Sequence, residues 1–366
     1  MYQYLKNTLR NTGFCCMLFF VQALFAQTNY PKPVEADYLC KDFSFVSGEK
    51  MAELKLHYTV LGTPQKDASG KVTNAVLIMH GTTGAGTNFL NERYAGNLFG
   101  PGQLLDATKY FLILPDAIGH GKSAKPSDGL HMRFPKYTYD DMVLADYKLI
   151  TEHLQINHLR MVMGTSMGGM HTWVWAYRYP DFMDALMPFA SLPVAIAGRN
   201  RIQRKMAIDL IKMDPEWKGG EYAVQPKLGL TGAISSMIFM TSSPLQWQKS
   251  APTRELAETM LENLEKRYLS LLDANDFIYQ FDASRDYNPQ PHLSKIKAPL
   301  FAVNSADDQV NPPEQGILEK EIKNVSKGRY ILLPITDQTN GHGTHSIPTV
   351  WSNYLKELLE LTSANK

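Results

Sequence analysis

The feature of this sequence that most restricts its fold is a series of short apolar runs, each followed by small or polar residues. Residues 75–79 (AVLIM) and 110–114 (YFLIL) are uninterrupted, and residues 159–163 (LRMVM) contain one arginine. Such runs are typical of parallel strands that are buried on both faces. The alternation of apolar and polar residues at 54–60 (LKLHYTV) predicts an earlier, half-buried strand, and helices are expected at residues 139–154 and 171–179. Strands that alternate with helices predict an α/β fold, with a mostly parallel central sheet flanked by helices.

The strand pattern is interrupted in the middle of the chain. From residue 192 to residue 288, methionine, leucine and charged residues recur as they do in helices. Strand-like runs return at residues 298–303 and 329–333, and a final helix is expected at residues 350–361. A helical cap inserted into the sheet domain accounts for this order. The predicted parts are a first core segment at 27–191, the cap at 192–288 and a second core segment at 289–366.

The N-terminus carries the longest apolar stretch of the chain. Lys6 and Arg10 precede residues 14–25, which are apolar with one exception, and Ala26 follows. This order of basic, apolar and small residues predicts a signal peptide over residues 1–26. A retained membrane anchor is the alternative, but the block is shorter than the roughly 20 residues of a membrane span. We therefore expect a periplasmic or secreted protein with no integral membrane association after signal cleavage.

Charge and cysteine content narrow the possible partners. The chain has 37 Lys and Arg against 36 Asp and Glu, a formal net charge of +1. This balance supplies no excess positive field for a phosphate backbone, so no nucleic-acid partner is expected. Signal removal would leave Cys40 as the one cysteine, and a single thiol cannot form an internal disulfide. The exported protein would then depend on its apolar core for stability.

Residues 164–168 (GTSMG) form a G-x-S-x-G motif between a predicted strand and a predicted helix. In this context the motif is typical of a nucleophile elbow, in which small neighbours allow a sharp turn that exposes a serine. A chance match in a glycine-rich turn is the alternative. The flanking strand and helix favour Ser166 as a nucleophile.

A serine hydroxyl needs a base that accepts its proton and an acid that orients the base. Asp307 and Asp308 follow the run that reopens the sheet domain, where the acid is expected. His342 lies between two glycines after the last predicted strand. We prefer His342 to His345 as the base because it directly follows the glycine of the expected loop. His345 is then expected to support the site or to face solvent.

Acyl transfer also requires backbone N–H groups that bind the developing oxyanion. Residues 80–84 (HGTTG) follow the first buried strand, where such a loop is expected. We assign the backbone amides of Thr82 and Met167 to the oxyanion hole. A glycine-rich turn without this function is the alternative for the loop.

No cofactor or metal site is expected. His342 and His345 form a His-x-x-His pair without a nearby cysteine or carboxylate, which is a weak metal motif. Residues 119–123 (GHGKS) lack the four-residue spacing of a phosphate-binding loop. His120 is interpreted as structural. His171, one turn after the serine, is interpreted as a surface or core histidine, with the pocket wall as the alternative.

Several longer segments together resemble one known family. They are 134–138 (FPKYT), 141–143 (DMV), 164–191 with Ser-Met-Gly-Gly-Met, 179–181 (YPD), 213–220 (MDPEWKGG), 273–275 (DAN) and 308–313 (DQVNPP). The chain is similar to the α/β-hydrolase superfamily and, within it, to the homoserine O-acetyltransferase group, from about residue 54 to the end.

This resemblance implies a site and a substrate class. It implies an acyl-Ser166 intermediate, His342 as base and acid, and Asp308 as the residue that orients the histidine. It also implies Thr82 and Met167 as oxyanion donors. A small-molecule acyl substrate and a homodimer, as in transferase relatives, are further expectations.

Departures from the transferase pattern favour hydrolysis over transfer. Thr165, His171 and Gly343 replace the glycine, glutamine and aspartate usual in the family, and Arg254 is the nearest candidate for an arginine expected in the transferase cap. Export would also separate the enzyme from cytoplasmic acetyl-CoA. We therefore expect an exported serine hydrolase that cleaves an ester or related acyl bond. An acyltransferase of the homoserine O-acetyltransferase type is the alternative, followed by a non-catalytic ligand-binding protein on the same fold.

Overall fold

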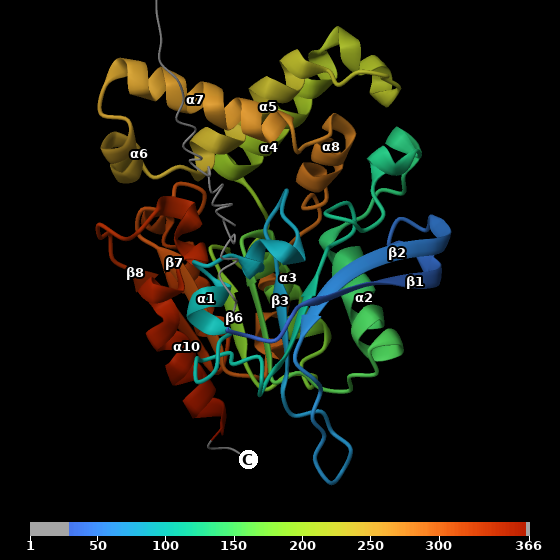
Figure 1. The fold of residues 1–366 in the computed structure, drawn as a ribbon, viewed down its shortest axis with the longest axis vertical. Helices are drawn as coiled ribbons and strands as arrows, with labels where there is room; N and C mark the ends of the chain where they lie inside the picture. The colour runs from blue at the N-terminus through green and yellow to red at the C-terminus, as the bar shows by residue number, and fades with distance from the viewer. Residues whose placement is uncertain (1–28, 364–366) are drawn as a thin grey trace, which may run out of the picture.

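The computed structural model describes residues 29–363, which form a central sheet of eight strands with helices on both faces (Figure 1). The strands are β1 Val34–Ser44, β2 Lys50–Leu61, β3 Ala75–Met79, β4 Phe111–Pro115, β5 Met161–Thr165, β6 Leu186–Phe189, β7 Leu300–Ser305 and β8 Gly328–Leu333. Their order in the sheet is β1-β2-β4-β3-β5-β6-β7-β8. The β1–β2 and β2–β4 pairs are antiparallel, and the others are parallel. The predicted α/β fold is confirmed.

Helices cover the two faces of the sheet and contribute to two apolar cores. The α-helices are α1 Ala95–Leu98, α2 Tyr139–Lys148, α3 Met167–Arg178, α4 Gly198–Met213, α5 Lys227–Thr241, α6 Pro244–Ser250, α7 Arg254–Leu269, α8 Ala274–Asp282, α9 Ile317–Glu321 and α10 Pro348–Ser363. Along β3, Leu77 packs in the core that contains α2 and α3, whereas Val76 and Ile78 pack in the core that contains α1 and α10. The alternation follows from the two-residue repeat of a strand, and it explains why an uninterrupted apolar run is needed there.

Helices α4 to α8 lie together over one end of the sheet, in the segment predicted as a cap (Figure 1). They have an apolar core of their own, to which α4, α5 and α8 contribute. Within residues 29–363, no single helix has the length and hydropathy of a membrane span. In this described part of the chain, one pair of helices, α5 and α6, reaches that composition when taken together, and the two are bent by 106° relative to each other.

The structure differs from the sequence prediction mainly at element boundaries. The strand predicted at residues 159–163 begins and ends two residues later, at Met161 and Thr165, and the following helix begins at Met167 instead of His171. The helix predicted at 139–154 ends as α2 at Lys148 and continues as a π-helical turn, Leu149–His153. Strands β1 and β6 were not predicted. The predicted signal peptide lies outside the described residues.

Candidate active site

Ser166 lies at the sharp turn between β5 and α3. Its backbone has φ 55° and ψ −112°, a conformation that residues with side chains rarely adopt. The flanking glycines permit this turn. A Cβ atom on Gly164 would lie 2.3 Å from the Gly168 carbonyl oxygen, and one on Gly168 would lie 2.0 Å from the Met79 carbonyl oxygen. The Ser166 side chain is therefore presented at the carboxyl end of β5, beside the N-terminus of α3.

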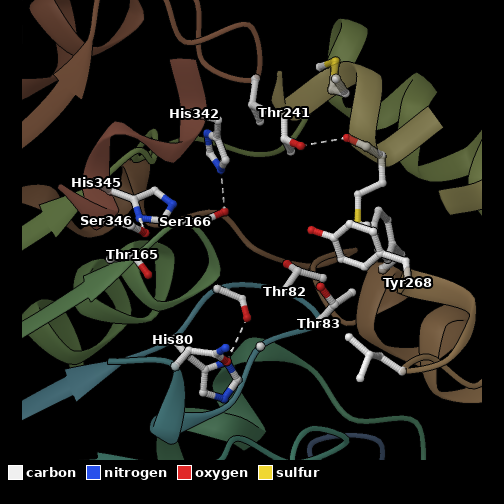
Figure 2. A pocket seen from close by; sticks show the side chains of 18 of the residues that line it. His80, Thr82, Thr83, Thr165, Ser166, Thr241, Tyr268, His342, His345 and Ser346 are labelled. Carbon is white, nitrogen blue, oxygen red and sulfur yellow. Dashed lines mark hydrogen bonds between the residues drawn. The ribbon is translucent and has the colours of Figure 1, made fainter. Parts of the chain in front are cut away.

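Three predicted residues meet at this end of the sheet. The Ser166 hydroxyl Oγ lies 2.8 Å from His342 Nε2. Figure 2 marks this contact with a dashed line. On the other side of the ring, His342 Nδ1 lies 2.9 Å and 3.0 Å from the two carboxylate oxygens of Asp308. Asp308 follows β7, and His342 lies in the 3-10 helix Gly341–Ser346 after β8. The geometry allows the imidazole to accept the serine proton while the carboxylate fixes the ring orientation.

The buried carboxylate of Asp308 is prepared to hold a negative charge. Burial by itself would raise its pKa, but the charge and hydrogen bond of His342 oppose this effect. Hydrogen bonds from the Asn311 side chain and the Val310 backbone also stabilise the charged form. The pKa of Asp308 is consequently below its usual value, so the carboxylate is ionised beside the imidazole.

Asp307, the other candidate acid, has a different position. Its Oδ2 atom accepts hydrogen bonds from the Gly341 backbone N–H at 2.8 Å and from the Ser243 hydroxyl at 3.2 Å. Its Oδ1 atom accepts from the Ser305 hydroxyl at 2.5 Å. Asp307 therefore braces the loop that carries His342, and the structure brings Asp308, not Asp307, to the imidazole.

His345 lies against His342, which is the first of the two positions expected for it, supporting the site, and not the second, facing solvent. The two rings meet edge to face with centroids 5.5 Å apart, and His345 also lines the cavity in front of Ser166. Its Nδ1 atom lies 2.9 Å from the Ser346 hydroxyl. Burial and the nearby His342 lower the pKa of His345 to about 3, so the ring is neutral near pH 7.

His80 holds the backbone of the loop predicted to bind the oxyanion. The Ala117 backbone N–H donates to His80 Nε2 at 3.1 Å, so Nδ1 carries the ring hydrogen. Nδ1 donates to the Gly81 carbonyl oxygen at 2.8 Å, and that oxygen also accepts from the Gly84 N–H at 3.0 Å. Burial lowers the pKa of His80 and keeps the ring in this neutral form.

The fixed Gly81 carbonyl orients the next backbone amide. In a planar trans peptide, the C=O and the following N–H point in opposite directions, so a carbonyl held by His80 turns the Thr82 N–H away from it. The loop lies beside the serine, since a Cβ atom on Gly81 would lie 3.4 Å from Ser166 Cβ. The Met167 N–H belongs to the first turn of α3, whose amides lack partners within the helix. Thr82 and Met167 stay the predicted oxyanion donors.

A cavity of about 450 Å³ opens in front of Ser166 (Figure 2). On the core side it is lined by the serine, His342 and the loop that follows β3. On the cap side, α4, α5 and α7 contribute Arg204, Thr241, Arg267 and Tyr268, none of which the sequence analysis selected. Arg204 lies at a buried position of α4 on the same face as Ala207, Ile208 and Ile211. In the sequence, a charged residue on the apolar face of a predicted helix could have marked Arg204 as a candidate for the site.

The other candidate histidines lie outside the cavity wall. His171 is buried and meets Tyr139 edge to face at 4.8 Å, in agreement with a core histidine and not with the alternative position in the pocket wall. His120 is buried behind the oxyanion loop, 5.1 Å from the His80 ring. Among the residues that the structure describes, no group of three or more His, Cys, Asp or Glu side chains has an arrangement suited to a metal ion.

Comparison with known proteins gives a consistent group of relatives. Residues 74–333 match the model of the alpha/beta hydrolase fold family. The chain is 35% identical over 362 residues to the homoserine O-acetyltransferase of Moorella thermoacetica, covering 85% of this chain and 93% of that protein. It is 33% identical over 308 residues to the homoserine O-acetyltransferase of Pelobacter propionicus, covering 74% and 80%.

Solved structures with the same fold include transferases and esterases. The homoserine O-acetyltransferase of Bacillus anthracis matches with a TM-score of 0.77 at 23% identity, over 89% of this chain and 97% of that chain. Esterase E22 matches with a TM-score of 0.77 at 19% identity, over 90% and 100%. The acetyl esterase MekB also gives 0.77, at 23% identity, over 90% and 97%. This fold therefore accommodates both transfer and hydrolysis.

Proposed function

Since the chain belongs to the alpha/beta hydrolase fold family, in its homoserine O-acetyltransferase-like group, we propose that it is a serine hydrolase that cleaves an ester or related acyl bond. The observation that carries this proposal is the continuous chain of contacts from Ser166 through His342 to Asp308. A serine, a base and a buried ionised carboxylate in contact in this order form the catalytic triad that serine hydrolases use for covalent acyl transfer.

In the proposed reaction, Ser166 Oγ attacks the substrate carbonyl carbon and His342 Nε2 accepts the hydroxyl proton. Asp308 stabilises the imidazolium, and the Thr82 and Met167 amides donate to the oxyanion of the tetrahedral intermediate. When the intermediate collapses, His342 returns the proton to the leaving alcohol and an acyl-serine forms. A water molecule, deprotonated by His342, then attacks the acyl carbon. As the bond to Ser166 Oγ breaks, His342 returns the proton to this oxygen, and the acid is released.

Transfer to an alcohol is the second candidate, and the identity to homoserine O-acetyltransferases favours it. Hydrolysis is ranked first because Arg254, the nearest candidate for the expected cap arginine, does not line the cavity. It pairs with Glu258 at 2.8 Å along the exposed side of α7. An acyl acceptor must compete with water at the acyl-serine, and Arg254 supplies no contact that would hold an acceptor there.

Two measurements test this proposal. A fluorophosphonate probe is expected to label the wild type and Ser346→Ala, a serine of the same cavity, but not Ser166→Ala. Labelling of Ser166→Ala would identify another nucleophile. Incubation with 4-nitrophenyl acetate is expected to release acetate whether or not homoserine is present. Formation of O-acetylhomoserine faster than acetate would replace hydrolysis by transfer.

We also propose that the protein is exported, on the basis of the basic, apolar and small residues over positions 1–26. Expression of the full chain in a Gram-negative bacterium, followed by fractionation and N-terminal sequencing, tests this. A periplasmic chain that begins near residue 27 is expected. A full-length chain that stays in the cytoplasm would contradict export.

A further inference from the structure

One wall of the cavity beside Ser166 carries polar groups without hydrogen-bond partners. They are the Thr165 hydroxyl, the Nε2 atom of His345 and the Tyr94 hydroxyl, which have no partner within residues 29–363, although all three residues line the cavity. We propose that these groups form a neutral subsite for a hydroxyl group of the substrate, so that the preferred substrates are esters that carry a free hydroxyl close to the acyl bond. This inference rests on the proposed function and names its substrate class.

The fold brings the three residues to one face of the sheet. Met163 of β5 packs in the core that contains α1 and α10. Because side chains alternate along a strand, Thr165 points to the same face as Met163. Tyr94, the residue before α1, belongs to that core. Trp351 connects it to His345, since its ring lies 6.0 Å from the Tyr94 ring and its Nε1 donates to the His345 carbonyl oxygen at 3.1 Å.

His345 can bond to a ligand hydroxyl in either of its neutral forms. Its Nδ1 lies 2.9 Å from the Ser346 hydroxyl. Figure 2 shows both residues on the same side of the Ser166 hydroxyl as Thr165. If Nδ1 accepts the Ser346 proton, Nε2 carries the ring hydrogen and donates, and if Nδ1 donates, Nε2 accepts. A hydroxyl both donates and accepts, so it satisfies Nε2 in each case.

These three groups carry no charge near pH 7. Burial and the nearby His342 lower the pKa of His345 to about 3, and burial raises the pKa of Tyr94. The Thr165 hydroxyl does not ionise. A charged ligand would therefore gain no opposite charge from this wall, whereas a hydroxyl needs only a donor or an acceptor.

The two hydroxyls of the wall are buried without hydrogen bonds. Thr165 is 3% exposed and Tyr94 is 1% exposed. The buried Thr172 of α3, by contrast, donates to the Gly168 carbonyl oxygen at 2.9 Å. A buried hydroxyl that makes no hydrogen bond loses the bonds that water would supply, so a substrate hydroxyl that restores them is favoured. In this the two side chains differ from the groups that take part in the proposed reaction, which have partners in the chain.

Two pairs of esters test for the subsite and locate the hydroxyl on the alcohol or the acyl side. Acetate release compares 3-hydroxypropyl acetate with butyl acetate, and ethanol release compares ethyl 3-hydroxybutanoate with ethyl 3-methylbutanoate. Within each pair, a hydroxyl replaces a methyl group of similar size. In at least one pair, kcat/KM is expected to be about fivefold or more higher for the hydroxylated ester, the effect of one hydrogen bond between neutral groups.

Variants connect this preference to the three residues. Tyr94→Phe, Thr165→Val and His345→Phe each remove a polar group and keep a side chain of similar shape. Each is expected to reduce the ratio of the two kcat/KM values toward one. Tyr137→Phe is the matched control and keeps the wild-type ratio, because the Tyr137 hydroxyl is also buried without a partner in the described chain but does not line the cavity.

Two kinetic results would overturn the subsite. One is a ratio near or below one in the wild type for both pairs, with esters that lack the hydroxyl still hydrolysed through Ser166, and this result leaves the proposed function intact. The other is a preference for the hydroxylated ester that survives all three variants.

A binding measurement separates the subsite from catalysis. In at least one pair, Ser166→Ala is expected to bind the hydroxylated ester at least about fivefold more tightly than its methyl counterpart by ligand-observed NMR, and addition of Tyr94→Phe is expected to reduce the difference. Equal affinities within both pairs would overturn the subsite. If no ester is hydrolysed and no fluorophosphonate label appears, the proposed function fails, whereas the binding result still decides the subsite.

Discussion

The sheet end and the cap contribute to the same cavity in different ways. At the sheet end, the polar groups around Ser166 are held by specific partners: Asp308 orients His342, Asp307 braces the loop, and His80 fixes the Gly81 carbonyl. On the cap side, Arg204 retains a free donor and Arg267 has no partner within the described chain. Side chains whose hydrogen bonds are all made within the protein are held in position before the substrate binds, as catalysis requires. Donors without a hydrogen-bond partner are available to bind the substrate. The core therefore holds the groups that the proposed reaction uses, and the cap contributes donors to the same cavity.

The largest decrease in kcat is expected when the base, His342, is removed. His342→Ala is expected to lower kcat for a neutral ester by about 10⁴-fold or more, because His342 is the one proton acceptor at hydrogen-bond distance from Ser166 Oγ within residues 29–363. His345→Ala, which removes the adjacent neutral ring, is expected to have a much smaller effect. Steady-state kinetics measure both. A comparable decrease of kcat in the two variants would contradict the assignment of His342, and not His345, as the catalytic base.

The two aspartates give the next largest contrast. Asp308→Asn is expected to lower kcat by roughly 10³-fold to 10⁴-fold, since the amide no longer stabilises the imidazolium or its correct tautomer. Asp307→Asn weakens the hydrogen bond to the Gly341 N–H, so it is expected to lower Tm with a smaller change in kcat. Thermal melts and kinetics on the same samples separate these effects. Equal losses of kcat would contradict the assignment of Asp308.

His80 is expected to act through the oxyanion loop. His80→Ala frees the Gly81 carbonyl, so kcat is expected to fall about 10-fold to 100-fold with little change in KM, because the Thr82 donor acts mainly in the transition state. His80→Asn, whose amide can donate to the same carbonyl, is expected to recover part of kcat. His120→Asn controls for loss of a buried histidine. A loss of stability in His80→Ala without a kcat change would assign His80 a structural role only.

The smallest predicted effect concerns the attachment of the cap. Asp276 of α8 accepts hydrogen bonds from the Ser127 backbone and hydroxyl at 2.8 Å and 2.6 Å. Burial raises the pKa of Asp276 to about 7, and the nearby Asp273 contributes to the shift. In the unfolded chain the pKa is about 3.9. The folded protein therefore retains a proton that the unfolded chain releases, and stability falls as pH rises from about 4 to about 7.

Asp276→Asn removes this titration. Between about pH 5 and about pH 8, the Tm of the wild type is expected to fall by a few degrees more than the Tm of Asp276→Asn. Asp209→Asn, at a more exposed cap position paired with Lys205, serves as the control. An unchanged pH dependence in Asp276→Asn would show that this carboxyl does not titrate in that range.

The site residues of the core could be predicted from the sequence more fully than those of the cap, because they depend on local motifs and on the order of the strands. The nucleophile motif is local, because strand, tight turn and helix are contiguous around Ser166, and chain topology then places Asp308 and His342 at neighbouring strand ends. The choice between Asp307 and Asp308 was made only by resemblance, since it depends on side-chain direction. Strand β6 was missed because it has four residues and includes Pro188.

The cap lining was not predicted because it depends on how separate helices pack. Arg267 is one of several charged residues along α7, and nothing in its local sequence shows that it lines the cavity. Arg204 was recognisable only as a charge on the buried face of α4. Strand β1, partly exposed at the edge of the sheet, lacks the uninterrupted apolar run that marked the central strands.

The central claim is that Ser166 carries the acyl group during the reaction. The most direct test is to quench the purified protein during turnover of 4-nitrophenyl acetate and to locate the acetyl group by intact mass and peptide mapping. One acetyl group on the peptide that contains Ser166, absent from Ser166→Ala, is the predicted result. Acetylation of another residue at the rate of turnover would contradict it.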